Sequence, residues 1–438
     1  MPEPGHRTRR SLEGVTTAAG TFDVTAVRAD FPILSESVNG EPLVYLDSAA
    51  TSQKPRVVLD AERSFLEHEN AAVHRGAHTL AAEATERFED ARAAVAAFVG
   101  ADPDSIVWTS GATCALNLVA YAVGNASLGR GAASAVRLSL GDEIVVTEAE
   151  HHANLIPWQE LAARTGAVLR HIPVHDDGTL DLDAAAEIIG ERTKIVTFSH
   201  VSNVLGIINP VAELVALAQR VGALTVLDAC QSAPHLPLDL PALGVDLAAF
   251  SAHKMLGPYG IGALYGRRDV LEALPPVATG GSMVTTVTLE RAEFLPAPQK
   301  FEAGTQPVSQ AIGWAAAVRY LDALGMPAVH EHERVLERRL REGIRGIAGV
   351  RLLGDADADR VALCAFDVDG VHAHDVGQVL DARGIAVRVG HHCAQPLHRR
   401  FGVTATVRAS ASVFTTEAEI DAFLDALSGV RAFFGVGR

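Results

Sequence analysis

Residues 193–250 decide the fold, because two apolar runs, Thr193-Lys-Ile-Val-Thr-Phe198 and Leu224-Thr-Val-Leu227, flank a stretch with helical spacing at residues 211–221. A third apolar run, Leu247-Ala-Ala-Phe250, follows. Short apolar runs that alternate with helices of about ten residues are typical of a mainly parallel sheet with helices on both faces. The sequence therefore predicts an α/β fold.

The same alternation extends toward the N-terminus. We expect further strands and helices as follows: strands at residues 43–47, 105–109, 142–147 and 168–172, and helices at residues 24–30, 57–69, 87–98, 114–122 and 155–165. Residues 124–140 are rich in Gly, Ala and Ser and lack periodicity, so they are predicted to form a surface insertion.

The pattern changes after about residue 310. We expect helices at residues 311–324, 328–344, 374–383 and 417–427, and strands at residues 360–367 and 385–389. These elements predict a smaller α+β domain. The expected organisation is therefore a disordered tail at residues 1–25, a large α/β domain at residues 26–310 and a small C-terminal α+β domain at residues 311–438.

Composition excludes several classes of protein. The formal net charge is -16, whereas a phosphate backbone is bound by clustered Lys and Arg, so nucleic acid is not an expected partner. No run of about 18 apolar residues is free of charge, so no membrane span is expected. Arg9 and Arg10 precede no apolar segment, which argues against export. The 4 cysteines have neither metal-ligand spacing nor disulfide density, so we expect a cytoplasmic protein without a metal site.

Polar side chains end several of the predicted strands. Asp228 ends one strand, and the segment Ser251-Ala-His-Lys254 ends the next. The pair His151-His152 follows a third strand, and Thr113 opens a helix whose free N–H groups suit an anion. Open parallel sheets bind ligands beyond the carboxyl ends of their strands, so we expect these side chains to meet there.

A lysine and a carboxylate beside an anion site are the set that pyridoxal 5′-phosphate (PLP) requires. The lysine forms a Schiff base, the carboxylate keeps the pyridine nitrogen protonated, and a helix N-terminus holds the phosphate. A nucleotide ligand fits the sequence less well than PLP does, because the chain lacks both a phosphate-binding loop and the motif G-x-G-x-x-G. Taken singly, each residue has a simpler interpretation. Asp228 could cap a turn or a helix, and Lys254 could be an ordinary solvated lysine. The pair His151-His152 lacks the third ligand that a zinc site would need.

At larger scale, six segments resemble the class V aminotransferase superfamily and, more narrowly, the SufS-type (group II) cysteine desulfurases. They are Asn70-Ala-Ala-Val-His-Arg-Gly76, His151-His-Ala-Asn154, Ser199-His-Val-Ser-Asn-Val-Leu-Gly206, Ser251-Ala-His-Lys254, Phe301-Glu-Ala-Gly-Thr305 and Arg388-Val-Gly-His-His-Cys393. The resemblance runs from about residue 26 to 427. It implies a fold-type I PLP-dependent transferase, a homodimer with its sites at the subunit interface, L-cysteine as substrate and a SufE- or SufU-like protein as sulfur acceptor.

The resemblance also implies a role for each matching residue. Lys254 would bind the cofactor covalently, and Asp228 would pair with the pyridine nitrogen. The remaining cofactor contacts would be Gln231 at the phenolic oxygen, His151 on the ring, Thr113, Ser251 and His253 at the phosphate, and Thr305 from the other subunit. Cys114 is grouped with them because it flanks the site, although packing explains it as well.

Substrate binding and sulfur transfer are implied by a second group. Asn203, Arg388 and Arg408 would bind the substrate carboxylate, a bidentate task that suits arginine. Cys393, which lies among polar residues in the sequence, would attack the substrate sulfur and carry it as a persulfide. His151 could move protons. Cys364 lies in an apolar run, as an inert buried cysteine does.

Three alternatives remain open on the sequence. A selenocysteine lyase would share nearly every residue named above. A PLP lyase or epimerase of the same fold would make no persulfide, and Cys393 in its motif argues against it. A non-catalytic protein that kept the fold is opposed by the intact set of Lys254, Asp228, Arg408 and Cys393. Cys230 and the run Gln306-Pro-Val308 depart from the usual family pattern.

Overall fold

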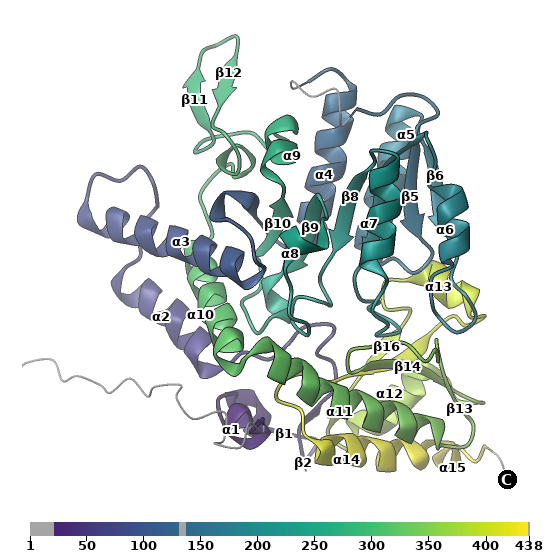
Figure 1. The fold of residues 1–438 in the computed structure, drawn as a ribbon. Helices are drawn as coiled ribbons and strands as arrows, with labels where there is room; N and C mark the ends of the chain where they lie inside the picture. The colour runs from purple at the N-terminus through teal and green to yellow at the C-terminus, as the bar shows by residue number, and fades with distance from the viewer. Residues whose placement is uncertain (1–21, 131–136, 437–438) are drawn as a thin grey trace, which may run out of the picture.

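A computed structural model describes residues 22–130 and 137–436 (Figure 1). Most of the predicted tail at residues 1–25 therefore lies outside the described residues. Within them, a sheet has the strand order β4 (Ile106–Thr109), β10 (Gly262–Gly266), β9 (Leu247–Ser251), β8 (Leu224–Asp228), β7 (Thr193–Ser199), β5 (Glu143–Thr147) and β6 (Val168–Ile172). The predicted α/β fold is confirmed.

The sheet is parallel except at β10, which runs antiparallel to both β9 and β4. β10 follows β9 without a crossover helix, and an antiparallel return needs none. Sequence reasoning missed this strand because glycines at both of its ends read as turn residues. Gly262 is needed for packing, because a Cβ atom there would lie 2.5 Å from the Cα atom of Gly111.

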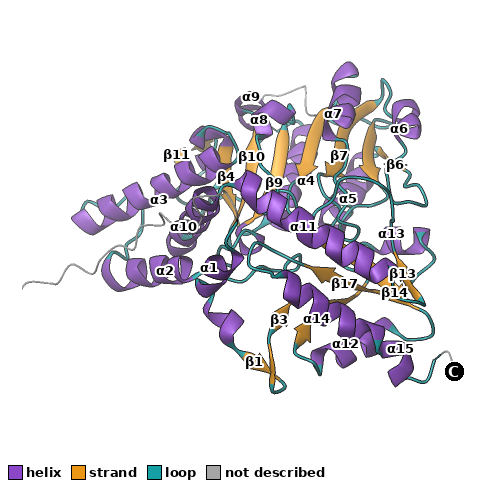
Figure 2. Ribbon diagram, turned by 60° about the horizontal axis from the view of Figure 1, so that its bottom comes forward, coloured by secondary structure: helices purple, strands orange, loops and turns teal. Residues whose placement is uncertain are grey.

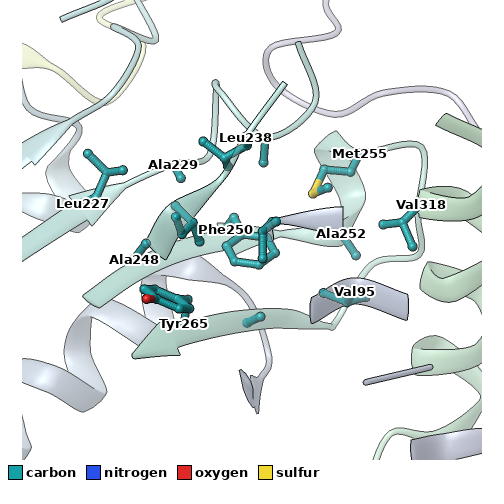
Figure 3. Close-up of a cluster of buried hydrophobic side chains, with 14 of the residues drawn as sticks. Val95, Leu227, Ala229, Leu238, Ala248, Phe250, Ala252, Met255, Tyr265 and Val318 are labelled. Carbon is teal, nitrogen blue, oxygen red and sulfur yellow. The ribbon is translucent and has the colours of Figure 1, made fainter. Parts of the chain in front are cut away.

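Helices cover both faces of the sheet (Figure 2). α4 (Ala112–Ser127) and α5 (Ile156–Thr165) share one hydrophobic cluster with the strands. The opposite cluster joins the strands to α7 (Val211–Arg220), α3 (Thr79–Phe98) and α10 (Val308–Leu324). Figure 3 shows part of that second cluster, in which Phe250 lies among Val95, Met255, Tyr265 and Val318.

A second, smaller sheet lies below the first in Figure 1. Its antiparallel order is β13 (Val350–Leu352), β14 (Leu363–Val368), β17 (Thr406–Ser410) and β16 (Arg388–Gly390). It packs in its own core with α11 (Met326–Arg345), α12 (Ala373–Asp381) and α14 (Glu417–Ser428). The division of the chain at residue 310 stays a prediction, and α10 just beyond it packs against α2 (Arg56–His68) and α3.

Two segments from opposite ends of the chain pair beside the small sheet. β3 (Val44–Tyr45) runs parallel to β15 (Ile385–Ala386), and Val44 and Leu46 are buried in the small domain's core. The predicted single strand at residues 385–389 is therefore wrong. β15 pairs with β3 whereas β16 pairs with β17, so the chain changes partner between them.

The predicted surface insertion at residues 124–140 is also partly wrong. α4 continues to Ser127, because Ala126 is buried and extends the apolar face of that helix. Leu138 is buried too, and its backbone N–H donates to Ser127 Oγ. Residues 131–136 lie outside the described residues.

The remaining elements are short. They are α1 (Val24–Ala29), β1 (Ser37–Val38), β2 (Glu41–Pro42), α6 (Leu182–Ile188), α8 (Leu240–Leu243), α9 (Arg268–Ala273), β11 (Val284–Val287), β12 (Ala292–Phe294), α13 (Gln395–Arg400) and α15 (Val430–Phe433). The hairpin β11–β12 projects from the large domain in Figure 1. Across the described residues, none of the helices combines the length and hydropathy needed to span a bilayer.

Candidate active site

A cavity of about 270 Å³ opens where the carboxyl ends of the parallel strands face the small domain. Most of the predicted site residues line it: Thr113, His151, Asn203, Asp228, Gln231, Ser251, His253, Lys254, Arg388, Cys393 and Arg408. In the described part of the chain, no group of three His, Cys, Asp or Glu side chains is arranged to hold a metal ion.

Two predicted contacts lie outside this cavity. Cys114 is exposed on α4, where one helical residue turns the side chain by about 100° from that of Thr113. The geometry therefore does not support its predicted cofactor contact. Thr305 is exposed on the segment that follows Glu302, a buried carboxylate paired with Arg92 at 2.6 Å. Its predicted role belongs to the other subunit and stays a prediction.

The neighbouring strands β8 and β9 bring the key carboxylate and lysine to one edge of the sheet. Asp228 is the last residue of β8 and pairs in register with Ala249 of β9. β9 ends at Ser251, and the short turn Ala252–Lys254 then presents Lys254 at the same edge. Two adjacent strand ends thus place a carboxylate and an amine in one cavity.

The start of α4 forms one end of the cavity. Gly111 precedes the helix with φ 149°, a conformation that glycine adopts most readily. The N–H of Ala112 donates to Ser251 Oγ at 2.8 Å, so the helix start is held beside the end of β9. Among the described residues, the buried Nδ1 atom of His253 has no hydrogen-bond partner, and burial lowers the pKa of His253 to about 4.

His151 lies in the cavity as a neutral imidazole. Burial first, and then the Lys254 charge, lower its pKa to about 4. Its Nδ1 atom accepts a hydrogen bond from the N–H of Ala153 at 3.0 Å, so the ring proton is on Nε2. The side chain of Gln231 donates to the carbonyl of Ala49 at 2.8 Å and keeps a buried Oε1 atom without a partner in the described chain.

These groups fit PLP on the chemistry of their donors. A helix start with a hydroxyl and an imidazole suits the phosphate, and Asp228 suits a protonated ring nitrogen. The orphaned polar atoms of His253 and Gln231 indicate that the cavity is built for a polar ligand, since buried polar groups are normally hydrogen-bonded. Lys254 supplies the amine that such a cofactor requires.

The other end of the cavity carries two arginines. Arg408 is 2% exposed, and its Nη1 donates to the carbonyl of Asn203 at 2.9 Å. Burial lowers its pKa to about 10. Its buried Nε atom has no partner in residues 22–130 and 137–436. Arg388 donates to Asp47 through Nε at 3.1 Å and Nη2 at 3.0 Å. Sequence reasoning missed Asp47, although it ends an expected strand.

Cys393 lies on a strained loop that the large domain holds in place. His392 and Cys393 have φ values of 48° and 55°, which side chains other than glycine adopt at a cost of about 1 kcal/mol or more each. The N–H of His152 donates to the carbonyl of Cys393 at 2.6 Å, and Asn203 Nδ2 donates to the carbonyl of His392 at 2.7 Å. Cys393 itself is exposed.

A buried hydrogen-bond chain behind this loop fixes the tautomer of His392. His398 Nδ1 lies 3.0 Å from the carbonyl of Ala394, which can only accept, so His398 carries its proton there. Its Nε2 then accepts from the Thr406 hydroxyl at 3.0 Å. Thr406 Oγ1 in turn accepts from His392 Nε2 at 2.9 Å, which leaves His392 Nδ1 as an acceptor. Sequence reasoning missed Thr406 and His398.

The model of the family "Aminotransferase class-V" matches residues 44–423. A "Probable cysteine desulfurase 2" of Mycobacterium leprae is 56% identical, covering 96% of this chain and 100% of its own. The chain belongs to the cysteine desulfurases of this family. The predicted family is thus confirmed, whereas the SufS-type subgroup stays a prediction.

Solved structures of family members agree with the fold. The apo cysteine desulfurase of Thermococcus onnurineus NA1 has a TM-score of 0.86 at 37% identity, covering 92% of this chain and 97% of its own. A C-DES mutant with glycine linked covalently to its PLP cofactor has a TM-score of 0.77 at 25% identity, covering 92% and 98%. The predicted fold-type I architecture of PLP enzymes is therefore confirmed.

Proposed function

We propose that the chain is a PLP-dependent enzyme that converts L-cysteine to L-alanine and carries the released sulfur as a persulfide on Cys393. Family membership supports the substrate and the cofactor. One observation carries the assignment of the nucleophile, namely that Cys393 lines the same cavity as Lys254 and Arg408. A lyase or epimerase without persulfide chemistry has no use for a thiol at that place.

The cofactor would lie across the strand ends. PLP, when bound, supplies the electron sink that stabilises charge at the substrate α-carbon. Lys254 would hold it covalently, and Asp228 would keep its ring nitrogen protonated. Thr113, Ser251 and His253 would bind its phosphate at the start of α4, where helix N–H groups favour an anion. Gln231 would bind the phenolic oxygen of the cofactor ring, and the neutral ring of His151 would lie on the face of that ring.

The proton transfers fall to two side chains of the cavity. Lys254 Nζ would be the base that takes the α-proton of the substrate and returns it. His151 has its proton on Nε2 at neutral pH, because its Nδ1 accepts from Ala153. It can therefore donate a hydrogen bond to the bound substrate without carrying charge.

Cys393 performs the sulfur transfer. Its thiolate attacks the sulfur of L-cysteine, and a new S–S bond forms as the substrate C–S bond breaks. The electron pair of the broken bond stays with the β-carbon, which takes up a proton to become the methyl group of L-alanine. Arg388 and Arg408 line the same cavity, so a substrate carboxylate bound there would lie in the same space as the Cys393 thiol.

The test compares Cys393→Ala with wild type and with Cys364→Ala, a matched control at a buried cysteine outside the cavity. Alanine and sulfide release from L-cysteine with a reductant are measured beside the absorption spectrum of the bound cofactor. We expect Cys393→Ala to keep the spectrum and lose sulfide release, and Cys364→Ala to keep both. Sulfide release by Cys393→Ala at the wild-type rate would refute the persulfide assignment.

Selenocysteine serves as a second substrate in the same assay. A wild-type protein that releases selenide but no sulfide would identify a selenocysteine lyase instead. Homodimerisation and a SufE- or SufU-like sulfur acceptor are part of the proposal, and the exposed position of Cys393 supports the acceptor. The cytoplasmic location also stays a prediction.

A further inference from the structure

β4 is the terminal strand at one side of the large sheet, so one of its edges faces no other strand in the described residues. β10 pairs with the opposite edge. A terminal strand leaves backbone N–H and C=O groups without strand partners, and such groups must be hydrogen-bonded by something else when they are buried. Ile106 and Trp108 are both buried, so this free edge needs side chains to complete its hydrogen bonds.

Arg92 and Glu302 supply these hydrogen bonds. Arg92 Nη1, from α3, donates to the carbonyl of Ile106 at 2.8 Å, and Glu302 Oε1 accepts from the N–H of Trp108 at 2.7 Å. The two side chains also bind each other, at 2.6 Å for the Nη1–Oε1 pair and 2.9 Å for the Nη2–Oε2 pair. They are 2% and 3% exposed, so a buried bidentate ion pair takes the place of a neighbouring strand.

β4 leads directly into the start of α4. Thr109 ends the strand, and the N–H of Ala112, the first residue of the helix, donates to Ser251 Oγ at 2.8 Å. The turn between them has little room to adjust, because a Cβ atom on Gly262 would lie 2.5 Å from the Cα atom of Gly111. A displacement of β4 would therefore move the N–H groups at the start of α4.

We propose that Glu302 is a positioning residue: together with Arg92 it fixes the free edge of β4 and thereby the helix start that binds the cofactor phosphate. The inference rests on the proposed function, because it takes the start of α4 as the phosphate site. Neither side chain lines the cavity, so the effect must pass through β4. The inference thus adds to the proposed site a buried ion pair that touches no part of the cofactor.

The test measures how much the phosphate group contributes to cofactor binding. The dissociation constants of PLP and of pyridoxal, which lacks the phosphate, are measured by absorbance with the full chain freed of cofactor. Both aldehydes can bond to Lys254, so the ratio of the two constants, pyridoxal over PLP, reports the phosphate contacts alone. Ser251→Ala, at the proposed phosphate site, is the positive control. Arg87→Met is the negative control, because it breaks the 2.7 Å ion pair with Glu69 elsewhere on α3.

The variants separate the buried charge from the hydrogen bond to Trp108. Glu302→Gln leaves the buried charge of Arg92 without its counter-charge, whereas Arg92→Met combined with Glu302→Gln removes that charge and keeps an acceptor for the Trp108 N–H. We expect the ratio to fall about tenfold in Glu302→Gln, to recover toward wild type in the double variant and to stay unchanged in Arg87→Met. Arg92→Lys keeps the charge but loses the bidentate contact, so it should lower the ratio and remain measurable if Glu302→Gln does not fold.

Urea unfolding of the same variants distinguishes positioning from stability. A wild-type ratio in Glu302→Gln and in Arg92→Lys, together with lowered unfolding midpoints, would overturn the proposal and leave a purely structural ion pair. An effect of Glu302→Gln that disappears in a Thr305→Val background would also overturn it, because the effect would then pass through the segment that carries Thr305 rather than through β4.

The same measurements keep this inference apart from the proposed function. A reduced ratio in Glu302→Gln with an unchanged ratio in Ser251→Ala would refute the Ser251 contact of the proposed function and keep the role of Glu302. A reduced ratio in Ser251→Ala alone would do the reverse. Sulfide release from L-cysteine by the wild-type protein depends on neither ratio, and it tests the persulfide assignment separately.

Discussion

The two ends of the cavity are built differently. The cofactor end consists of strand termini and a helix start within one sheet, where Asp228 and Ser251 close regular strands. The sulfur end consists of a loop with two left-handed residues, His392 and Cys393, held by hydrogen bonds from the large domain. A rigid end suits a cofactor that must stay aligned. A loop that hydrogen bonds hold outside any regular element suits a thiol that must reach both a substrate and an acceptor.

The largest effect is expected at the rigid end, from Lys254→Ala. In the proposed mechanism, losing this amine removes both the covalent link to the cofactor and the proton acceptor, so we expect alanine release to fall by about a thousandfold or more. The bound cofactor should become removable by dialysis. Lys194→Ala, at a lysine outside the cavity, is the control. Retention of the wild-type spectrum after dialysis of Lys254→Ala would contradict this role.

Acid should weaken the rigid end through its buried histidines. Burial lowers the pKa of His200 to about 4, below its ordinary value of about 6.5. Between these two values the unfolded chain binds more protons than the folded one, so stability is lost as pH falls from about 6.5 toward 4. His200 alone should account for about 2 kcal/mol of the loss between pH 7 and pH 5. Urea unfolding of His200→Gln should show a correspondingly smaller pH dependence, and an equal one would contradict it.

The sulfur end should respond to Thr406→Val without any change at the cofactor. This substitution removes the hydroxyl between His392 and His398 and leaves buried imidazole nitrogens unpaired. We expect sulfide release and the alkylation rate of Cys393 by iodoacetamide to change about tenfold, since such a loss is worth about 1–3 kcal/mol. The cofactor spectrum should stay that of wild type, and Thr406→Ser should restore both rates. A spectral change in Thr406→Val would show that the two ends are not separable.

The smallest effect should come from relieving strain in the loop. Cys393 has φ 55°, which glycine adopts without the Cβ clash that alanine meets. Cys393→Gly should therefore be more stable than Cys393→Ala by about 1 kcal/mol, measured by urea unfolding of the two inactive proteins. Equal stabilities would mean that the loop relaxes when the thiol is removed.

The sequence predicted the rigid end better than the sulfur end, for a physical reason. Strand termini such as Asp228 and Ser251 can be predicted because an apolar run in the sequence stops at a known residue. The sequence does not predict the partner of Arg388, because Asp47 reaches this arginine only through the pairing of β3 with β15. Thr406 and His398 were missed likewise, because their roles depend on a tautomer chain that folding creates.

Other local predictions failed because neighbours in the sequence suggested a role that the fold does not support. The strand β10 was missed because Gly262 serves close packing against Gly111, and Gly266 close packing against Leu271, rather than a turn. Cys114 follows a predicted phosphate contact in sequence, yet the helical turn places it outside the cavity. Nearness in sequence therefore identified the neighbourhood of the site but not its individual contacts.

The pairing of β3 with β15 also sets the order in which the protein can be completed during synthesis. Val44 leaves the ribosome long before Ile385, its partner in the strand pair, has been translated. The sheet of the large domain, by contrast, uses strands between Ile106 and Gly266 and can assemble earlier. Cys393, Arg388 and Arg408, which we propose as nucleophile and carboxylate-binding residues, thus join the molecule late. A nascent chain would therefore form the proposed cofactor site before the proposed sulfur-transfer site.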